Sequence, residues 1–200
     1  MNFAQSNTAR QPMNILFRCT VNSRTINTEV LYNTIVQSGS KKHAAVFTIV
    51  KNEAFFLPRW LAYYSKSFSR EDIYVLDHQS TDGSTDDLAC NCSVVRHRFA
   101  YNPDWLRSVV QRMQCRLLRR YDLVLFTEVD EFVVPNPDRW PTLRSYICDC
   151  TSDVVACKGY NIVHMPEKEP PFDMQRSFLK QRQYWYVTSE YAKPLLARIP

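Results

Sequence analysis

The stretch that decides the fold is YDLVLFTEVDEF, residues 121–132. Its apolar run, Tyr121 to Phe126, is typical of a strand buried inside a sheet. Three acids follow at once, namely Glu128, Asp130 and Glu131. Carboxylates held close together raise one another's pKa unless a cation neutralises them, so the stretch favours a divalent metal site at the end of a strand. The alternative is that Glu128 and Glu131 are solvated and Asp130 caps the next turn.

Two earlier stretches repeat this order of an apolar strand followed by polar residues. Ala44 to Val50 predicts a strand covered on both faces, and the polar residues 51–53 follow it. Ile73 to Leu76 predicts a second strand that ends at Asp77, and residues 77–86 read DHQSTDGSTD. This polar loop is either a ligand loop at the carboxyl end of a strand or a turn followed by a helix N-cap.

Helical patterns separate these predicted strands. Residues 55–68 predict a helix with Pro58 in its first turn, and Asn102 followed by Pro103 predicts the start of another. Val94 and Val95 predict a short strand, residues 139–146 a helix, and residues 154–157 a later strand. Alternating strands and helices predict an α/β fold with a mostly parallel sheet flanked by helices. Right-handed crossovers would bring residues 51–53, residues 77–86 and the acidic stretch 128–131 to one edge of that sheet.

The chain divides into a polar leader and a domain. Residues 1–42 are rich in Asn, Thr and Ser, alternate as a half-buried strand near residues 15–21, and end in the loop SGSKK. We therefore expect one domain over residues 43–200. No terminating signal precedes Pro200, so we expect this domain to be incomplete at its C-terminal end.

Composition limits the classes of function only loosely. The chain has 200 residues, 45% of them hydrophobic, and a net charge of +5, which suits an anionic small molecule as well as other acidic partners. We expect no nucleic-acid partner. Neither a signal peptide nor an apolar run of about 20 residues is visible, which predicts a cytoplasmic protein with at most peripheral membrane contact. The pairs Cys90/Cys92 and Cys148/Cys150 are spaced too closely for a usual structural zinc site, and reduced thiols are the alternative.

Together these motifs resemble those of the family 2-like glycosyltransferases with a GT-A, Rossmann-like fold. The residues that carry the resemblance are Lys51-Asn52-Glu53 with Trp60, Asp77 before Ser80-Thr81-Asp82-Gly83-Ser84, and Glu128-Val129-Asp130-Glu131-Phe132. They match the subgroup whose metal motif reads Asp-x-Asp-Glu-Phe. The resemblance implies a nucleotide-sugar donor, commonly a UDP-sugar, and Mn²⁺ or Mg²⁺ on its diphosphate.

The resemblance also implies roles for individual residues. Asn52, Glu53, Asp77 and Asp82 would line the nucleotide-sugar site, and Asp130 would hold the metal together with Glu128. Glu128 departs from the family pattern, which usually has Asp there, so it would bind the metal directly, through water, or only support the site. A second carboxylate or histidine would act as general base toward an acceptor hydroxyl, and the candidates are Asp153, His164 and Asp173.

Four further alternatives stay open from the residues. The chain could be a non-catalytic remnant that binds a nucleotide, or a metal-dependent nucleotidyltransferase, although no Gly-rich phosphate loop is visible. Arg112, Arg116 and Arg120 form either a solvated helix face or an anion site. The aromatic residues between 181 and 191 either pack in the core and at the sheet edge or stack on a ring-shaped ligand; they are Tyr184, Trp185, Tyr186 and Tyr191.

Overall fold

The computed structural model describes residues 16–19, 44–88, 90–94, 102–173, 176, 180–188 and 194–198. Most of the predicted leader and Tyr191 lie outside these residues. None of the helices in the described ranges is long and apolar enough to cross a membrane. The described chain forms a mixed α/β structure with two sheets.

The larger sheet has six strands in the order β4-β3-β2-β5-β10-β7. Neighbouring strands β4, β3, β2 and β5 all run parallel, while β10 is antiparallel to both β5 and β7. This arrangement is the mostly parallel sheet that the sequence predicts. Its strands are β2 (Ala44–Val50), β3 (Ile73–Asp77), β4 (Asn91–Val94), β5 (Leu123–Phe126), β7 (Val154–Ala156) and β10 (Pro194–Ala197).

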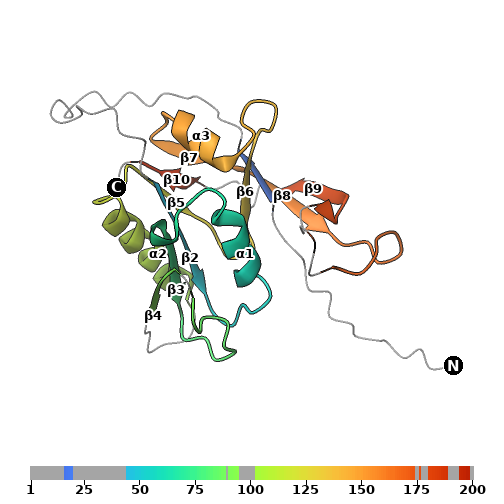
Figure 1. Cartoon of the computed structure of the whole chain (residues 1–200), viewed down its shortest axis with the longest axis horizontal. Coiled ribbons are helices and arrows are strands. Elements are labelled where there is room, and N and C mark those ends of the chain that lie inside the picture. The colour runs from blue at the N-terminus through green and yellow to red at the C-terminus, as the bar shows by residue number, and fades with distance from the viewer. Residues whose placement is uncertain are drawn as a thin grey trace.

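Helices cover both faces of the six-stranded sheet (Figure 1). Successive residues of β2 point to opposite faces: Val46 packs in one cluster with Trp60 of α1 (Leu57–Tyr64), and Phe47 packs in another with Val109 of α2 (Pro103–Leu117). Two-sided burial explains why β2 reads as a continuous apolar run. The arginine face predicted on α2 is exposed at all three positions, as a solvated face would be.

The boundaries of two helices differ from the sequence prediction. The helix α1 is shorter than residues 55–68, because after Ser65 the backbone bonds to Tyr63 and Tyr64 form turns instead of a continuing helix. The helix α3 (Leu143–Asp149) begins later than residue 139, because Thr142 and Ser145 form a capping box at residue 142. A short 3₁₀ helix, η1 (Arg70–Asp72), leads into β3.

The smaller sheet has four strands in the order β6-β1-β8-β9. They are β6 (Phe132–Pro135), β1 (Leu16–Cys19), β8 (Lys158–Val163) and β9 (Tyr184–Thr188). The strand β1 lies between β6, to which it is parallel, and β8, to which it is antiparallel. The strand expected in the polar leader is therefore a central strand of this sheet, and a domain start at residue 43 stays a prediction. In Figure 1, β8 and β9 extend away from the six-stranded sheet.

Candidate functional site

The loops after β2 and β3 are tied together by side chains. Asn52 has a left-handed backbone conformation (φ 57°), which asparagine adopts more readily than most residues. Its side-chain Oδ1 accepts a hydrogen bond from the Thr81 backbone N–H at 2.7 Å, and its own N–H donates to Ser80 Oγ at 3.0 Å. Asn52 thus ties together the loops after β2 and β3, two of the three loops that the sequence predicts to meet at one edge of the sheet.

Asp77 and Asp82 shape the loop after β3. Asp77 is buried, and its Oδ1 accepts a hydrogen bond from the Ser80 N–H at 2.8 Å, so it closes the first turn. Asp82 accepts from the N–H groups of Ser84 (3.0 Å) and Ala54 (3.2 Å), and it therefore also bridges to the β2 loop. Hydrogen bonding to Ser84 and Ala54 lowers the pKa of Asp82 despite some desolvation.

The acidic stretch after β5 divides into two parts. Glu131 is fully buried, and its Oε2 accepts a hydrogen bond from the Glu128 N–H at 3.1 Å, while its carbonyl accepts from the Tyr64 hydroxyl at 3.1 Å. Glu131 therefore stabilises the turn between β5 and β6, and the expectation that it is solvated is wrong. Glu128 and Asp130 are half-buried and line a pocket.

This pocket lies at the carboxyl ends of β2, β3 and β5 and has a volume of about 280 Å³. Three of its lining residues are the acids Glu53, Glu128 and Asp130, and one is a lysine, Lys51. The parallel sheet brings them together from two loops that are separate in the sequence. The remaining lining residues are Ile49, Val50, His78, Trp105, Leu106 and Val129.

One wall of the pocket consists of an aromatic pair. The ring of His78 packs at a tilt against that of Trp105, with centroids 4.6 Å apart and planes inclined at 36°. His78 is buried at the end of β3, and its backbone N–H donates a hydrogen bond to the Val50 carbonyl at 2.8 Å. Trp105 stands in the first turn of α2, where Asn102 caps the helix by accepting from the Asp104 and Trp105 N–H groups. Sequence reasoning assigned no role to this pair, although a helix that starts after β4 must start at this edge of the sheet.

The carboxylates of the pocket interact electrostatically. Burial raises the pKa of Glu53, and the negative charges of Asp130 and Asp82 raise it further. Within the described residues, no group of three or more His, Cys, Asp or Glu side chains converges closely enough to hold a metal ion alone. Magnesium-like ions are commonly bound by one or two carboxylates plus substrate phosphates, and these carboxylates fit that kind of site.

The candidate general bases lie in different places, and none of the three lines the pocket. Asp153 is exposed and immediately precedes β7. The strand β10 is antiparallel to both β5 and β7, so β5 and β7 run in the same direction. Asp153 therefore lies at the amino ends of the parallel strands, opposite the pocket. His164 follows β8, and its Nε2 is buried without a hydrogen-bond partner among the described residues. Asp173 is exposed beside Phe172, whose ring lies 5.6 Å from that of Phe55, two residues after Glu53.

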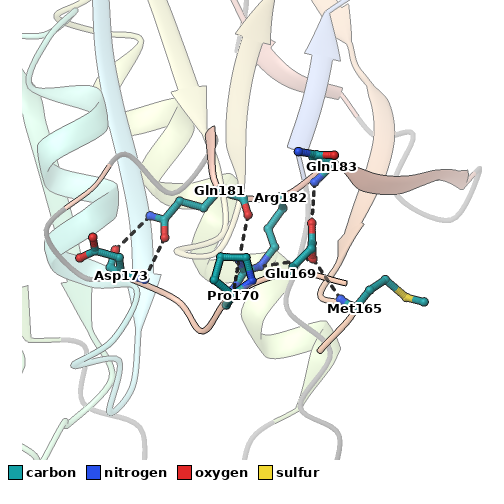
Figure 2. Close-up of polar contacts among 7 residues, drawn as sticks. All are labelled: Met165, Glu169, Pro170, Asp173, Gln181, Arg182 and Gln183. Carbon is teal, nitrogen blue, oxygen red and sulfur yellow. Dashed lines mark hydrogen bonds and ion pairs between the residues drawn. The ribbon is translucent and has the colours of Figure 1, made fainter. Parts of the chain in front are cut away.

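The segment between β8 and β9 is held by a buried ion pair (Figure 2). The Glu169 carboxylate accepts hydrogen bonds from the N–H groups of Met165 (3.0 Å) and Gln183 (2.8 Å), and Arg182 Nε lies 3.9 Å from it. Burial raises the pKa of Glu169, but these two hydrogen bonds and the charge of Arg182 outweigh it, so the pKa lies below its ordinary value. Gln181 bonds to the Asp173 backbone at both its N–H and its carbonyl.

Comparison with known proteins adds little to this geometry. No protein-family model matches the sequence. No curated protein matches it either. Among solved structures, the chain is similar to mannosyltransferase PcManGT from Pyrobaculum calidifontis in complex with GDP-Man and Mn²⁺, with 18% identity and a TM-score of 0.38. The match covers 65% of this chain and 38% of that chain.

Proposed function

We propose that the chain is a metal-dependent glycosyltransferase domain of the family 2-like, GT-A type, which transfers a sugar from a nucleotide-sugar to an acceptor hydroxyl. The observation that carries the proposal is the pocket at the carboxyl edge of the parallel sheet, where Glu53, Glu128 and Asp130 meet an aromatic wall. Open α/β sheets bind their ligands at this edge. A nucleotide diphosphate suits such a pocket because one end of it is a flat ring and the other carries negative charge.

In this proposal the carboxylates hold the cation and the cation holds the diphosphate. Asp130 and Glu128 would bind Mn²⁺ or Mg²⁺, which stabilises the negative charge that develops on the departing diphosphate. Glu53 and Asp130 repel one another without a cation, because each charge adds to the electrostatic cost of the other. Lys51, which also lines the pocket, supplies a positive charge for the phosphates.

The aromatic wall is suited to the base of the nucleotide. His78 and Trp105 present apolar surface beside the acids, and a nucleobase, uracil in our proposal, would pack against it. Asn52, Asp77 and Asp82 would act mainly by fixing the loops after β2 and β3. A side-chain oxygen of each accepts a hydrogen bond from a backbone N–H group in these loops. For the general base we retain His164 and Asp173, because Asp153 lies at the opposite edge of the sheet.

The decisive experiment measures binding before turnover. Isothermal calorimetry with UDP and with GDP, each with and without Mn²⁺, should show binding that depends on the metal. Asp130→Asn should weaken that binding by about 100-fold, which corresponds to roughly 2.7 kcal/mol. Asp153→Asn, an exposed acid at the far edge, is the matched control and should bind as the wild type does.

Turnover then separates an enzyme from a nucleotide-binding remnant. A panel of nucleotide-sugars is incubated with the protein and Mn²⁺, and release of the nucleoside diphosphate is measured. Release that Asp130→Asn abolishes supports a transferase. Metal-dependent binding without release from any donor would leave only the remnant, and the absence of metal-dependent UDP or GDP binding would refute the proposal.

A further inference from the structure

The strand β9 exposes large aromatic side chains. Trp185 is 61% exposed, Tyr186 54% and Tyr184 36%, so these three residues do not pack in the core; they lie on an edge strand, as the other half of that alternative has it. A protein surface rarely exposes such side chains side by side without a partner. The question is which partner these rings fit.

The register of β8 and β9 gathers part of this surface on one face. Ile162 lies opposite Trp185, and Tyr160 lies opposite Val187, so these four side chains share a face of the sheet. The rings of Tyr160 and Trp185 touch edge to face, with centroids 5.2 Å apart and planes at 74°. We call these four residues the β8–β9 aromatic patch.

The sheet register also places the patch relative to the acidic pocket. Val187, Tyr160, Leu16 and Phe132 are successive partners across β9, β8, β1 and β6. Ile162 and its partner Trp185 lie two residues further along β8 and β9 than Tyr160 and Val187. In the register of the sheet, this direction leads toward the residues that precede Phe132, and Asp130 is one of them. Three strand spacings separate β6 from β9, which is about 14 Å.

The patch lies on the face of the smaller sheet against which α1 packs at β6. Phe132 belongs to the same face as Tyr160 and Trp185 by register, and its ring stacks on Tyr64 of α1 with planes at 10°. The helix α1 begins four residues after Glu53. Phe132 is fully buried beneath α1, so the patch is the part of this face that α1 leaves exposed.

Buried polar contacts hold the residues that lead into β9. Arg182, with a side chain 2% exposed, donates to the Gln181 carbonyl at 2.8 Å and pairs with Glu169, which also holds the Gln183 N–H (Figure 2). A rigid support lowers the ordering cost of binding at an aromatic surface.

We propose that the β8–β9 aromatic patch binds the acceptor as a neutral oligosaccharide, whose reacting end reaches the acidic pocket while a more distant ring packs on Trp185. This inference rests on the proposed function. Sugar rings present apolar C–H faces together with hydroxyl edges, which suits an exposed indole beside a tyrosine hydroxyl. The exposed charges of the adjoining segment have both signs, with Glu167 and Asp173 beside Lys168 and Arg176, so the surface is less suited to an anionic membrane.

The test uses the intact protein on an array of soluble neutral oligosaccharides without donor or metal. Bound glycans are then titrated by calorimetry. Trp185→Ala should weaken their binding by at least about tenfold, and Trp185→Phe should retain most of it, because the phenyl ring still offers a flat face. Val154→Ala removes an equally exposed apolar side chain from β7 and should change nothing.

Three further measurements decide between occupants. Trp185→Ala and wild type should bind UDP with Mn²⁺ equally well. If neither protein binds UDP with Mn²⁺, the result counts against the proposed function alone. Nucleotide binding without binding of any oligosaccharide would overturn the acceptor inference and leave the proposed function standing. Trp185-dependent binding to phosphatidylcholine or phosphatidylserine vesicles, or Trp185-dependent dimerisation in light scattering, with no glycan bound, would overturn it in favour of a membrane or a second copy.

Discussion

Replacing Thr127 with valine should destabilise the protein by removing a buried hydroxyl group. Thr127 is fully buried at the end of β5, immediately before Glu128, and its Oγ accepts a hydrogen bond of 2.8 Å from the indole N–H of Trp60. Trp60 is itself fully buried in the core beneath α1. Valine has nearly the same shape, so Thr127→Val removes the acceptor without opening a large cavity.

The expected cost follows from the burial of the donor. The indole N–H bonds to water in the unfolded chain but would have no acceptor in the folded core. Leaving this buried donor unsatisfied costs roughly 1–3 kcal/mol of unfolding free energy. For a chain of this size about 2 kcal/mol corresponds to a fall in Tm of about 4–8 °C. Urea denaturation followed by tryptophan fluorescence measures the loss in unfolding free energy directly.

Thr48 provides a matched control on the neighbouring strand. It is also fully buried, but its Oγ has no hydrogen-bond partner among the described residues. Thr48→Val should therefore be neutral or slightly stabilising, because it removes a buried polar group that gains nothing. Equal effects of the two substitutions, or a Thr127→Val protein as stable as wild type, would refute the reasoning.

Three other predictions concern charge and capping. Glu53→Gln should raise Tm at neutral pH in EDTA, because the raised pKa of Glu53 means that ionising its carboxyl costs stability as the pH rises above 4.5. The gain in Tm should shrink below that pH. A variant with a lower Tm than wild type at neutral pH would contradict this assignment of the raised pKa. Glu169 has a lowered pKa, so its ionised carboxylate stabilises the protein above pH 4.5, and this stabilisation is lost as the pH falls through the pKa of the folded state. Plots of Tm against pH for wild type and Glu169→Gln should therefore converge in acid. Parallel plots would argue against a stabilising carboxylate at this position. Asn102→Ala should cost about 1 kcal/mol in urea denaturation by removing the cap of α2, while Asn102→Asp should not, and an alanine variant with wild-type stability would count against the cap.

The sequence predicts β2, β3 and β5 well because these strands are strongly patterned, but it misses β10, and β4 begins at Asn91 rather than at the predicted Val94. The apolar run of β2 matches the observed Ala44–Val50 exactly in its bounds, since both faces of that strand are covered by helices. The start of α2 after Asn102 is also confirmed, because the cap, the proline and the first-turn acid all act locally. The late start of α3 was missed because apolar spacing alone does not reveal the capping box at Thr142.

The candidate site was predictable in its location but not in its details. Parallel pairing of β2 with β3 and β5 brings Glu53 and Asp130 to one pocket, as the order of elements suggested. The burial of Glu131 is not visible in the sequence, because the turn in which its Oε2 accepts a hydrogen bond depends on tertiary packing. The pairing of His78 with Trp105 escaped for the same reason, since the two residues come from elements far apart in the chain.

The position of β1 has a consequence for how the protein folds. This first strand of the described residues lies between β6 and β8, so the smaller sheet is completed only when residues 16–19 meet partners from much later in the sequence. Such long-range pairing is slow, because a large loop must close before the contact is gained. During synthesis at about 5–20 residues per second, β1 waits for many seconds before β8 exists. A chain begun after residue 19 would leave β6 and the β8–β9 hairpin without the strand that joins them.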